Sequence, residues 1–543
     1  MISEPVVGKN FFGREETLGL LDRRMKAMRD GYRQNIAITG QSLAGKSSLL
    51  QHFLYTAVDD SFLPVYIEVL KEDFQSFANK FMATLLYNSM KSREDLRPDD
   101  FNGLIAKAEK ALPKTVSAVR EVLAQIEKRE LDGAYTKLLG LTSVVKEETA
   151  KSCIVILDEF DNISGFRVKN PFSSFGKVIM TQKDTMYIIS SSRNSALKKI
   201  LREKLSLLFG NFEIVDLKGF SSRAASEFLD RKAHPFVING GLKKFLIYFT
   251  DGNPFYLEHL ALEAKNIARD RQLEAIDPES MQEAIVNLVY GANGTIHQYL
   301  SNLLFDLLDT RSRESGISIL ASAASGHRRQ REMAKDLRMS SSDVSKSLNR
   351  LMDLGLVARS GVFWEISDRM LEFWLSHVHL SRQRMLVNYI VDRARTNRDD
   401  IREYMNGFLL ESGKTVLERV FELFNLFSGE IVDIDDKRFS LPQFDKVEIK
   451  AFDDITPCIC ASLGGKAWLC RIFDRPIGES DIAEFLRNAR SLDSKVERKI
   501  LIALGDIEDN ARLLAKELRM SIWNLDTANL LLRLYGRRGL VLL

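Results

Sequence analysis

The stretch that decides the fold is NIAITGQSLAGKSSLLQHFL, Asn35 to Leu54. It begins with an apolar run, Ile36 to Thr39, and ends with apolar residues at helical spacing. Between them stands the pattern G-x-x-x-x-G-K-[ST], which predicts a loop whose backbone N–H groups surround phosphate oxygens. We therefore expect a phosphate-binding loop made of Gly40, Gln41, Ser42, Leu43, Ala44, Gly45, Lys46, Ser47 and Ser48.

The residue types in this loop predict its ligands. Lys46 is placed to reach the β- and γ-phosphates of a nucleoside triphosphate, and the Ser47 hydroxyl is a ligand type that suits Mg²⁺. The N-terminus of the following helix adds partial positive charge. ATP and Mg²⁺ are therefore the expected cofactors.

A second signal is SCIVILDEFDNI, Ser152 to Ile163. Its apolar residues from Cys153 to Leu157 predict a strand buried on both faces, which is typical of a central parallel strand. Asp158 at the end of this strand suits a Mg²⁺ ligand beside Ser47, and Glu159 suits a general base for the attacking water. The alternative is that both residues only cap the next helix.

Three further apolar runs, at 62–69, 185–193 and 212–217, predict the other strands of a five-stranded α/β sheet. Ligands of such sheets lie outside the carboxyl ends of the strands. Ser192, in the third serine position of TMYIISSSR, is placed there to contact the γ-phosphate or the attacking water. The expected catalytic set is Lys46, Asp158, Glu159 and Ser192.

The bulk composition limits the class of protein. A chain of 543 residues is too long for one hydrophobic core, so several domains are expected. The net charge of +3 excludes a polycationic nucleic-acid coat but permits a local basic face. The four cysteines lack the spacing of a zinc site and are expected to be buried thiols. Neither a signal peptide nor an apolar run of about 18 residues is recognisable, which predicts a cytoplasmic protein without a membrane partner.

Three further segments carry a resemblance to a family. FFGREETLGLL, Phe11 to Leu21, and TDGNPFYLEHLA, Thr250 to Ala261, together with DLKGFSSRAASEFL, resemble motifs of prokaryotic AAA+-related ATPases of the STAND and initiator-like groups. The resemblance to this archaeal ATPase family covers residues 1 to 300. It implies nucleotide contacts from Phe11, Gly13 and Arg14 near the adenine and ribose, and from Asn253 and Pro254 in a helical lid. Simple core packing is the alternative for Phe11.

One position departs from the family. The family often has Leu-x-Gly-Arg before the last strand, whereas here Gly210 is followed by Asn211. If that arginine completes a site, Arg193 or Arg202 has to supply its function. If neither does, hydrolysis is expected to be slow and the nucleotide cycle to work as a switch.

The predicted organisation follows from these motifs. We expect a P-loop ATPase core at 1–218, with a helical insertion at about 71–150, followed by a helical lid at 219–305. A winged helix-turn-helix domain is expected at 306–378, a helical linker at 379–408 and a last α/β domain at 409–543. The insertion is either a partner-binding element or an elaboration that only adds packing. A homo-oligomer or a partner protein is possible for such a machine.

The winged-helix prediction depends on residues 313–376, which read as three helices and a hairpin with Gly361 at its tip. Ser340 to Ser342 offer N-caps for a helix with Val344, Leu348 and Leu351 at core spacing. Basic residues around this helix and hairpin suit double-stranded DNA; they are Arg328, Arg329, Lys346, Arg350 and Arg359. Internal packing that couples nucleotide state to domain position is the alternative.

The last domain, at about 410–540, resembles the restriction-endonuclease-like (PD-(D/E)xK) fold. That fold cuts DNA with acidic residues and a lysine around Mg²⁺, and Glu418 and Asp445 stand at plausible places. The strand KAWLCRIFD, however, has Cys470-Arg471-Ile472 where the family has E-x-K, which predicts an inactive domain. An alternative site would combine Glu448 and Lys450 on a neighbouring strand with Asp433 or Asp435.

Three functions remain open from the sequence. The first is an ATPase switch that moves a winged helix and an inactive nuclease-like domain on DNA or on a partner. The second is an ATP-controlled nuclease for mobile-element control or defence. The third is a nucleotide-regulated scaffold that does not bind DNA.

Overall fold

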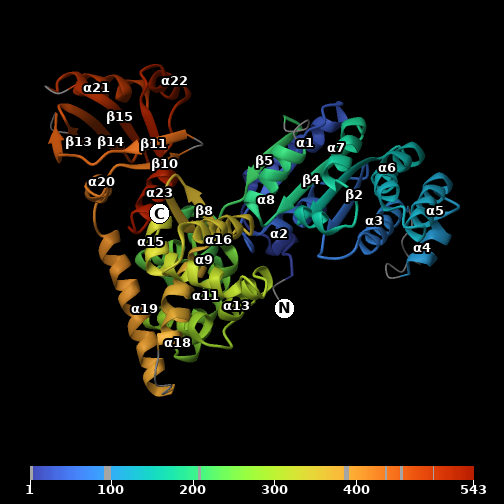
Figure 1. The fold of residues 1–543 in the computed structure, drawn as a ribbon, viewed down its shortest axis with the longest axis horizontal. Helices are drawn as coiled ribbons and strands as arrows, with labels where there is room; N and C mark the ends of the chain where they lie inside the picture. The colour runs from blue at the N-terminus through green and yellow to red at the C-terminus, as the bar shows by residue number, and fades with distance from the viewer. Residues whose placement is uncertain are drawn as a thin grey trace. The chain divides into compact units, whose positions relative to one another are not determined.

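In a computed structural model, the chain groups into two compact units (Figure 1). The structure describes residues 4–90, 100–205, 210–384, 390–434, 437–452, 457–492 and 495–543. The first unit consists of Met1–Phe220, Asn253–Phe255 and Asp353–Gly355, and the second of Ser221–Gly252, Tyr256–Met352 and Leu356–Leu543. Asp435 lies outside the described residues.

The first unit is built on a parallel sheet with the strand order β2-β3-β4-β1-β5. Its strands are β1 (Asn35–Thr39), β2 (Phe62–Glu68), β3 (Ser152–Asp158), β4 (Thr185–Ser191) and β5 (Phe212–Asp216). All five strands predicted from the apolar runs are confirmed. β3 and β4 lie in the middle of the sheet and are buried along almost their whole length, because each has strands on both sides and helices on both faces.

Helices cover the two faces of this sheet. The side chains of Ile36, Ile38, Ile154 and Ile188 face one layer, which contains α1 (Glu15–Arg29) and α2 (Lys46–Thr56). The opposite face packs against the remaining helices of the unit. These are α3 (Phe74–Ser89), α4 (Phe101–Ala108), α5 (Pro113–Glu127), α6 (Leu131–Thr149), α7 (Pro171–Thr181), α8 (Asn194–Lys199) and the turns η2 (Phe160–Gly165) and η3 (Ile200–Lys204).

The predicted helical insertion at 71–150 forms helices α3 to α6. Phe77, Phe81, Val119 and Leu138 of these helices belong to the same continuous core as the strand residue Val155. A shared core of this kind stabilises the edge of the sheet at β2, since that edge would otherwise expose a strand. The geometry therefore favours the packing alternative for the insertion.

The second unit begins with helices and two short strand pairs. The first group is α9 (Ser222–Ala233), β6 (Val237–Ile238), α10 (Gly240–Thr250), α11 (Pro254–Asp270), β7 (Ala275–Ile276), α12 (Pro278–Ile285), η5 (Val286–Tyr290) and α13 (Thr295–Leu307). The first residues of α11 group with the first unit. Next come α14 (Arg313–Ala324), α15 (Gln330–Asp336), α16 (Ser341–Asp353) and the hairpin of β8 (Val357–Ser360) and β9 (Phe363–Ile366).

The order of three helices and a hairpin agrees with the sequence prediction for residues 313–376. Ser340 caps α16 by accepting a hydrogen bond from the Asp343 N–H at 3.1 Å, and Gly361 lies in the hairpin turn at φ +61°. The chain then continues through α17 (Arg369–Phe373), η6 (Trp374–His379), α18 (Leu380–Arg384) and the long α19 (Ile390–Ser412).

The last part of the second unit contains a mixed five-stranded sheet with the order β12-β13-β14-β15-β16. Its strands are β12 (Lys446–Ala451), β13 (Pro457–Leu463), β14 (Lys466–Phe473), β15 (Lys495–Ala503) and β16 (Ser521–Asn524). A separate hairpin, β10 (Glu430–Ile434) with β11 (Lys437–Leu441), precedes it. The core on one face includes α20 (Val416–Phe424) and α23 (Leu525–Leu534), and the core on the other includes α21 (Glu479–Arg490) and α22 (Asp509–Glu517).

This sheet corrects one sequence expectation. β13, which the sequence interpretation did not identify, pairs with both β12 and β14. Glu448 and Lys450 on β12 are therefore not on the strand next to Cys470 on β14. All four cysteines are free and buried, which confirms the reading of them as buried thiols.

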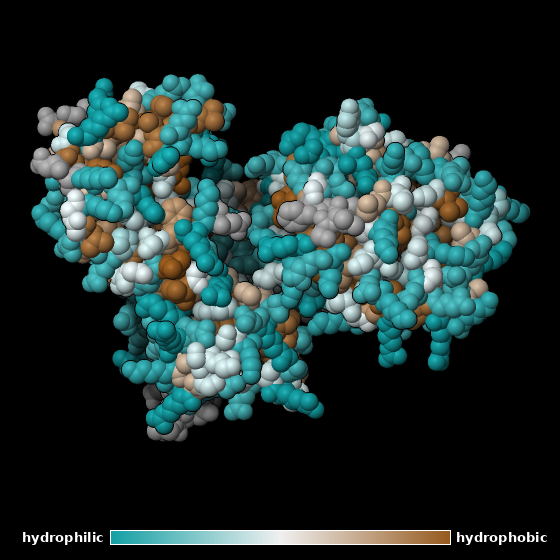
Figure 2. Space-filling model, turned by 45° about the horizontal axis from the view of Figure 1, so that its top comes forward, coloured by the Kyte–Doolittle hydropathy of each residue, from teal (hydrophilic) through white to brown (hydrophobic). Residues whose placement is uncertain are grey.

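On the face shown in Figure 2 the surface is mainly hydrophilic, and hydrophobic residues appear on it as scattered patches. Among the described residues, no helix combines the length and the apolar composition needed to cross a membrane.

Candidate functional site

The predicted phosphate loop joins β1 to the N-terminus of α2. Its backbone curls through left-handed conformations at Leu43 (φ +61°) and Gly45 (φ +92°). Gly40 is required for a different reason, since a Cβ there would come 2.5 Å from the carbonyl oxygen of Leu217. The loop therefore has the tight backbone that a phosphate-binding loop needs.

Lys46 lies inside the loop and is only 4% exposed. Its ammonium group donates to the carbonyl oxygens of Gly40 at 3.0 Å and Gln41 at 2.9 Å, and to the Ser192 hydroxyl at 2.8 Å. Burial lowers the pKa of Lys46, while the nearby carboxylates, Glu159 first among them, oppose that shift. The amine is thus held where triphosphate oxygens would replace the carbonyl oxygens as its partners.

Asp158 at the end of β3 is almost completely buried and accepts four hydrogen bonds. Its Oδ2 accepts from the Ser47 hydroxyl at 2.6 Å and from the Tyr66 hydroxyl at 2.8 Å. Its Oδ1 accepts from the Ser190 hydroxyl and from the Glu159 N–H at 3.1 Å. A carboxylate next to a hydroxyl oxygen is the kind of donor set that Mg²⁺ prefers, so Ser47 and Asp158 fit the metal.

Glu159 follows in the left-handed region, at φ +53°. Its carboxylate accepts from the Ser192 hydroxyl and from the Ser192 N–H at 3.1 Å. Burial raises the pKa of Glu159, partly offset by Lys46. Ser192 therefore contacts both the predicted base and the predicted phosphate-binding lysine, and the sequence-predicted set Lys46, Asp158, Glu159 and Ser192 is brought together at one edge of the sheet.

The three consecutive serines of β4 and the turn after it each contact a different acidic residue. Ser190 donates to Asp158, Ser191 donates to Asp161 at 2.6 Å, and Ser192 donates to Glu159. Asp161 also forms an ion pair with Arg193. Arg193, a candidate replacement for the missing family arginine, therefore has a carboxylate partner within its own unit.

Sequence interpretation missed three side chains of this site. They are Tyr66 on β2, Asp161 in η2, and Asn194 at the start of α8, whose side-chain oxygen accepts from the Gly40 N–H at 2.7 Å. Asn194 directly follows the predicted strand at 185–193, and Asp161 lies three residues after Asp158 in the quoted acidic segment; these positions were the available signals. No local signal marked Tyr66, because it lies inside an ordinary apolar strand.

The residues implied by the family resemblance mostly brace the loop. Phe11 stacks on His52 with ring centroids 4.0 Å apart, which agrees with the packing alternative. Gly13 has φ +69°. Arg14 donates to the Ala44 carbonyl oxygen at 3.0 Å, and burial lowers its pKa to about 10.

Three more residues of the predicted nucleotide set have partners in the first unit. The Ser48 hydroxyl accepts from the Val6 N–H at 3.0 Å. Asn253 is buried and donates to the Ser42 carbonyl oxygen at 3.4 Å, while Pro254 begins α11. Contacts of these side chains with adenine or ribose remain a prediction.

Of the five predicted DNA-contacting residues, the four arginines are bonded to other groups of the chain, and the lysine is largely exposed. Arg328 pairs with Glu372 at 2.8 Å, Arg329 pairs with Glu332 and Glu430, and Arg350 pairs with Asp309. Arg359 donates to the Gly361 carbonyl oxygen at 2.9 Å. Lys346 has 78% of its side chain exposed and lies 3.9 Å from Asp343.

The hairpin β8–β9 contacts the hairpin β10–β11 within the second unit. The Val362 N–H donates to the Ile431 carbonyl oxygen at 3.1 Å, and the Gly361 N–H donates to the Asp433 carboxylate at 2.9 Å. A Cβ at Gly361 would overlap the Ile431 carbonyl. The tip of the hairpin β8–β9 is therefore covered by the hairpin β10–β11 of the same chain.

The predicted nuclease residues have other partners in the structure. Glu418 accepts from the Thr415 N–H at 2.7 Å and so forms a helix cap. Asp445 accepts from the Gly464 N–H at 2.9 Å, and Glu448 pairs with Lys450 at 3.1 Å and with Lys446. Within the described ranges, no group of three or more His, Cys, Asp or Glu residues is arranged to hold a metal ion.

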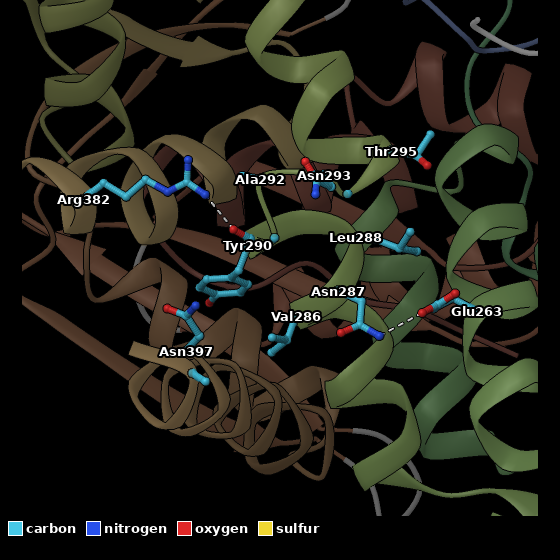
Figure 3. A pocket seen from close by; sticks show the side chains of 13 residues that line it. Glu263, Val286, Asn287, Leu288, Tyr290, Ala292, Asn293, Thr295, Arg382 and Asn397 are labelled. Atoms are coloured by element: carbon cyan, nitrogen blue, oxygen red, sulfur yellow. Dashed lines mark hydrogen bonds between the residues drawn. The ribbon is translucent and has the colours of Figure 1, made fainter. Parts of the chain in front are cut away.

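One open cavity of about 670 Å³ lies elsewhere, in the second unit between η5, α13 and α19 (Figure 3). Two of its polar side chains are bonded to other groups lining it, since Arg382 donates to the Tyr290 carbonyl oxygen at 2.7 Å and Asn287 donates to Glu263 at 2.8 Å. It contains none of the predicted site residues.

Comparisons with known proteins agree with the N-terminal site. Residues 11–260 match the model of an ATPase domain found predominantly in Archaea. The match covers just under half of the chain. No curated protein matches the chain.

Solved structures give weaker likenesses. A Walker-type ATPase of Pyrococcus abyssi is 17% identical over 69% of this chain and 99% of that one, with a TM-score of 0.49. The ORC2 protein of Aeropyrum pernix, solved in ADPNP–ADP complexes, is 12% identical over 71% and 98%, with a TM-score of 0.42. The RuvB Holliday junction branch migration motor of Thermotoga maritima is 12% identical over 67% and 94%, with a TM-score of 0.34. Likenesses this weak carry no inference about function.

Proposed function

We propose that the protein is an ATP-binding and ATP-hydrolysing molecular switch. The observation that carries the proposal is the contact of Ser192 with both Lys46 and Glu159, directly beside Asp158. The meeting of a lysine, two carboxylates and a hydroxyl at one edge of the sheet supports the roles of phosphate-binding cation, metal carboxylate and general base for these residues. The match of residues 11–260 to an ATPase domain supports the same reading.

Each side chain has a defined part in the reaction. The loop N–H groups and Lys46 bind and orient the triphosphate. Ser47 and Asp158 would hold Mg²⁺, which would supply positive charge to neutralise the triphosphate. Glu159 accepts the proton of the attacking water. Because the Ser192 hydroxyl donates to Glu159 and accepts from Lys46, it orients the carboxylate beside the lysine.

Replacement of Ser192 by alanine tests this arrangement. We expect kcat to fall about tenfold while the KM for ATP changes less than twofold, because the variant loses a charge-assisted hydrogen bond to the base but keeps the phosphate loop. The measurement is steady-state Mg²⁺-dependent phosphate release. Ser89→Ala is a suitable control, since that hydroxyl donates only to the Leu85 carbonyl oxygen at 2.6 Å in α3. Equal kcat in Ser192→Ala and wild type would contradict the role of Ser192.

We further propose that residues 306–378 form a winged helix that binds double-stranded DNA, and that α16 is its reading element. The exposed side chains of α16 are polar, and they include Lys346. The tip of β8–β9 is bonded to β10–β11, so a wing contact with DNA requires that this hairpin first be released. α16 keeps its exposed face in either state.

Lys346→Ala is expected to weaken DNA retention several-fold and to lower the slope of affinity against salt by about one, as the loss of one phosphate contact predicts. Arg359→Ala removes the same charge from the docked hairpin and is expected to change affinity less than twofold. Fluorescence anisotropy with a short duplex at several salt concentrations measures both. A larger loss in Arg359→Ala than in Lys346→Ala would contradict the proposal, and no retention at low salt would favour the scaffold alternative.

For residues 409–543 we propose a restriction-endonuclease-like domain without nuclease activity. The support is local: Cys470 is buried in the sheet core, where burial raises the pKa of its thiol, and Glu448 is neutralised by two lysines at the exposed edge. An ATP-controlled nuclease is the alternative. That alternative predicts that the wild-type protein cleaves plasmid DNA in the presence of Mg²⁺ or Mn²⁺, and that Lys450→Ala abolishes this cleavage.

A further inference from the structure

A tyrosine outside the sequence motifs contacts the predicted metal-binding carboxylate. Tyr66 lies on β2, the strand that pairs with β3 so that Glu68 is opposite Asp158. Its ring packs against the core layer that contains α1 and α2. Its hydroxyl leaves that layer and donates to the Oδ2 of Asp158 at 2.8 Å.

We propose that Tyr66 is a positioning residue for the Mg²⁺ site, which fixes the Asp158 carboxylate through its hydroxyl. This inference rests on the proposed ATPase function and adds a residue to it. The same Oδ2 accepts from only one other side chain in the described structure, the Ser47 hydroxyl at 2.6 Å. When a metal binds, Ser47 has to direct its oxygen to that metal. Tyr66 is therefore the donor that stays with Oδ2 both without and with the metal.

The chemistry of the tyrosine suits this task. A phenol hydroxyl keeps its proton at neutral pH, so the Tyr66 hydroxyl acts as a donor toward Asp158. Oδ1 is held separately, by Ser190 and the Glu159 N–H, so both oxygens of the carboxylate are oriented before a metal binds.

A purely structural role is the competing explanation. The ring of Tyr66 fills space in the α1 and α2 layer, and phenylalanine would fill the same space. Under that explanation the hydroxyl matters only for folding stability. Under our proposal its removal leaves packing intact but loosens Asp158, so the effect appears in metal dependence.

The test compares Tyr66→Phe with wild type in binding rather than in turnover. A fluorescent ATP analogue is titrated in EDTA, and Mg²⁺ is then titrated at fixed nucleotide. We expect the Mg²⁺ concentration for half-saturation to rise about tenfold, the effect of losing a hydrogen bond to a charged group. Nucleotide affinity in EDTA is expected to stay within twofold of wild type.

The chain offers a matched control. Tyr187 is another buried tyrosine of the same sheet, on β4, and its hydroxyl donates to the Gln182 side-chain oxygen at 2.7 Å. Tyr187→Phe removes a buried tyrosine hydroxyl bond that does not involve Asp158, and we expect it to leave the Mg²⁺ half-saturation unchanged.

A double-mutant cycle gives a second readout. In an Asp158→Asn background, Tyr66→Phe is expected to shift the Mg²⁺ half-saturation less than twofold, because the tyrosine acts through that carboxylate. The inference is overturned if Tyr66→Phe behaves like Tyr187→Phe, or if its tenfold effect persists without Asp158. If the proposed ATPase function is wrong, the result is distinguishable, because the wild type would then bind no nucleotide either in EDTA or in Mg²⁺.

Discussion

Lys46→Ala is expected to lose ATP turnover, with kcat/KM falling about 10³-fold. The ammonium group is buried and donates to the carbonyl oxygens of Gly40 and Gln41 and to the Ser192 hydroxyl. Triphosphate oxygens are stronger acceptors for a cation than carbonyl oxygens, so the lysine contributes most once phosphate is bound. Removal of one preorganised charged donor from such a site costs about 10²–10³ in rate, and here binding is lost as well.

The measurement is phosphate release together with nucleotide titration. Lys80→Ala is the control, because Lys80 is a half-exposed lysine of the same unit that pairs with Glu72 at 2.7 Å. Circular dichroism should show that the secondary structure of Lys46→Ala is intact. The glycines of the phosphate loop, and not the lysine, determine the backbone path of that loop. Turnover within tenfold of wild type would remove Lys46 from the mechanism.

Glu159→Gln is expected to lower kcat by about 10²–10³ while ATP affinity stays within a few-fold of wild type. A glutamine keeps the size of the side chain and its hydrogen bond with Ser192 but cannot accept the proton of the attacking water. The variant should therefore hold ATP without hydrolysing it. Isolation of bound, unhydrolysed ATP after gel filtration measures this directly. The exposed Glu147→Gln in α6 is the control.

The pH dependence of wild-type turnover gives an independent check on Glu159. Burial raises its pKa above the ordinary glutamate value of 4.5. Only the carboxylate form accepts a proton, so kcat should fall as pH is lowered through that raised pKa. The acid limb should disappear in Glu159→Gln. A glutamine variant with wild-type turnover would assign the base to another residue.

Prediction from sequence succeeded where the signal is contiguous. The strand, glycine-rich loop and helix from Asn35 to Leu54 form one local unit, and the apolar run before Asp158 is long enough to identify a buried strand. Both put Lys46 and Asp158 at the carboxyl edge of a parallel sheet, since that is where such loops emerge.

Prediction failed where strands are short or interrupted. β10 and β13 were missed, although β13 contains Cys458 and Cys460, which the sequence correctly indicated to be buried thiols. Because β13 separates β12 from β14, Glu448 and Lys450 do not lie on the strand that pairs with Cys470. Local sequence patterns do not predict the order of strands in a sheet, and that order determines which side chains come into contact.

The sequence by itself determined the phosphate loop, the acidic strand and the five parallel strands, because backbone geometry over a few residues and apolar periodicity suffice for these. Only the tertiary structure decided that Tyr66 reaches Asp158, 92 positions away, and that Asp433 holds the hairpin tip at Gly361, 72 positions away. Contacts of this kind depend on which strand or hairpin packs beside which. That choice follows from burying the whole apolar surface at once, and no single segment contains it.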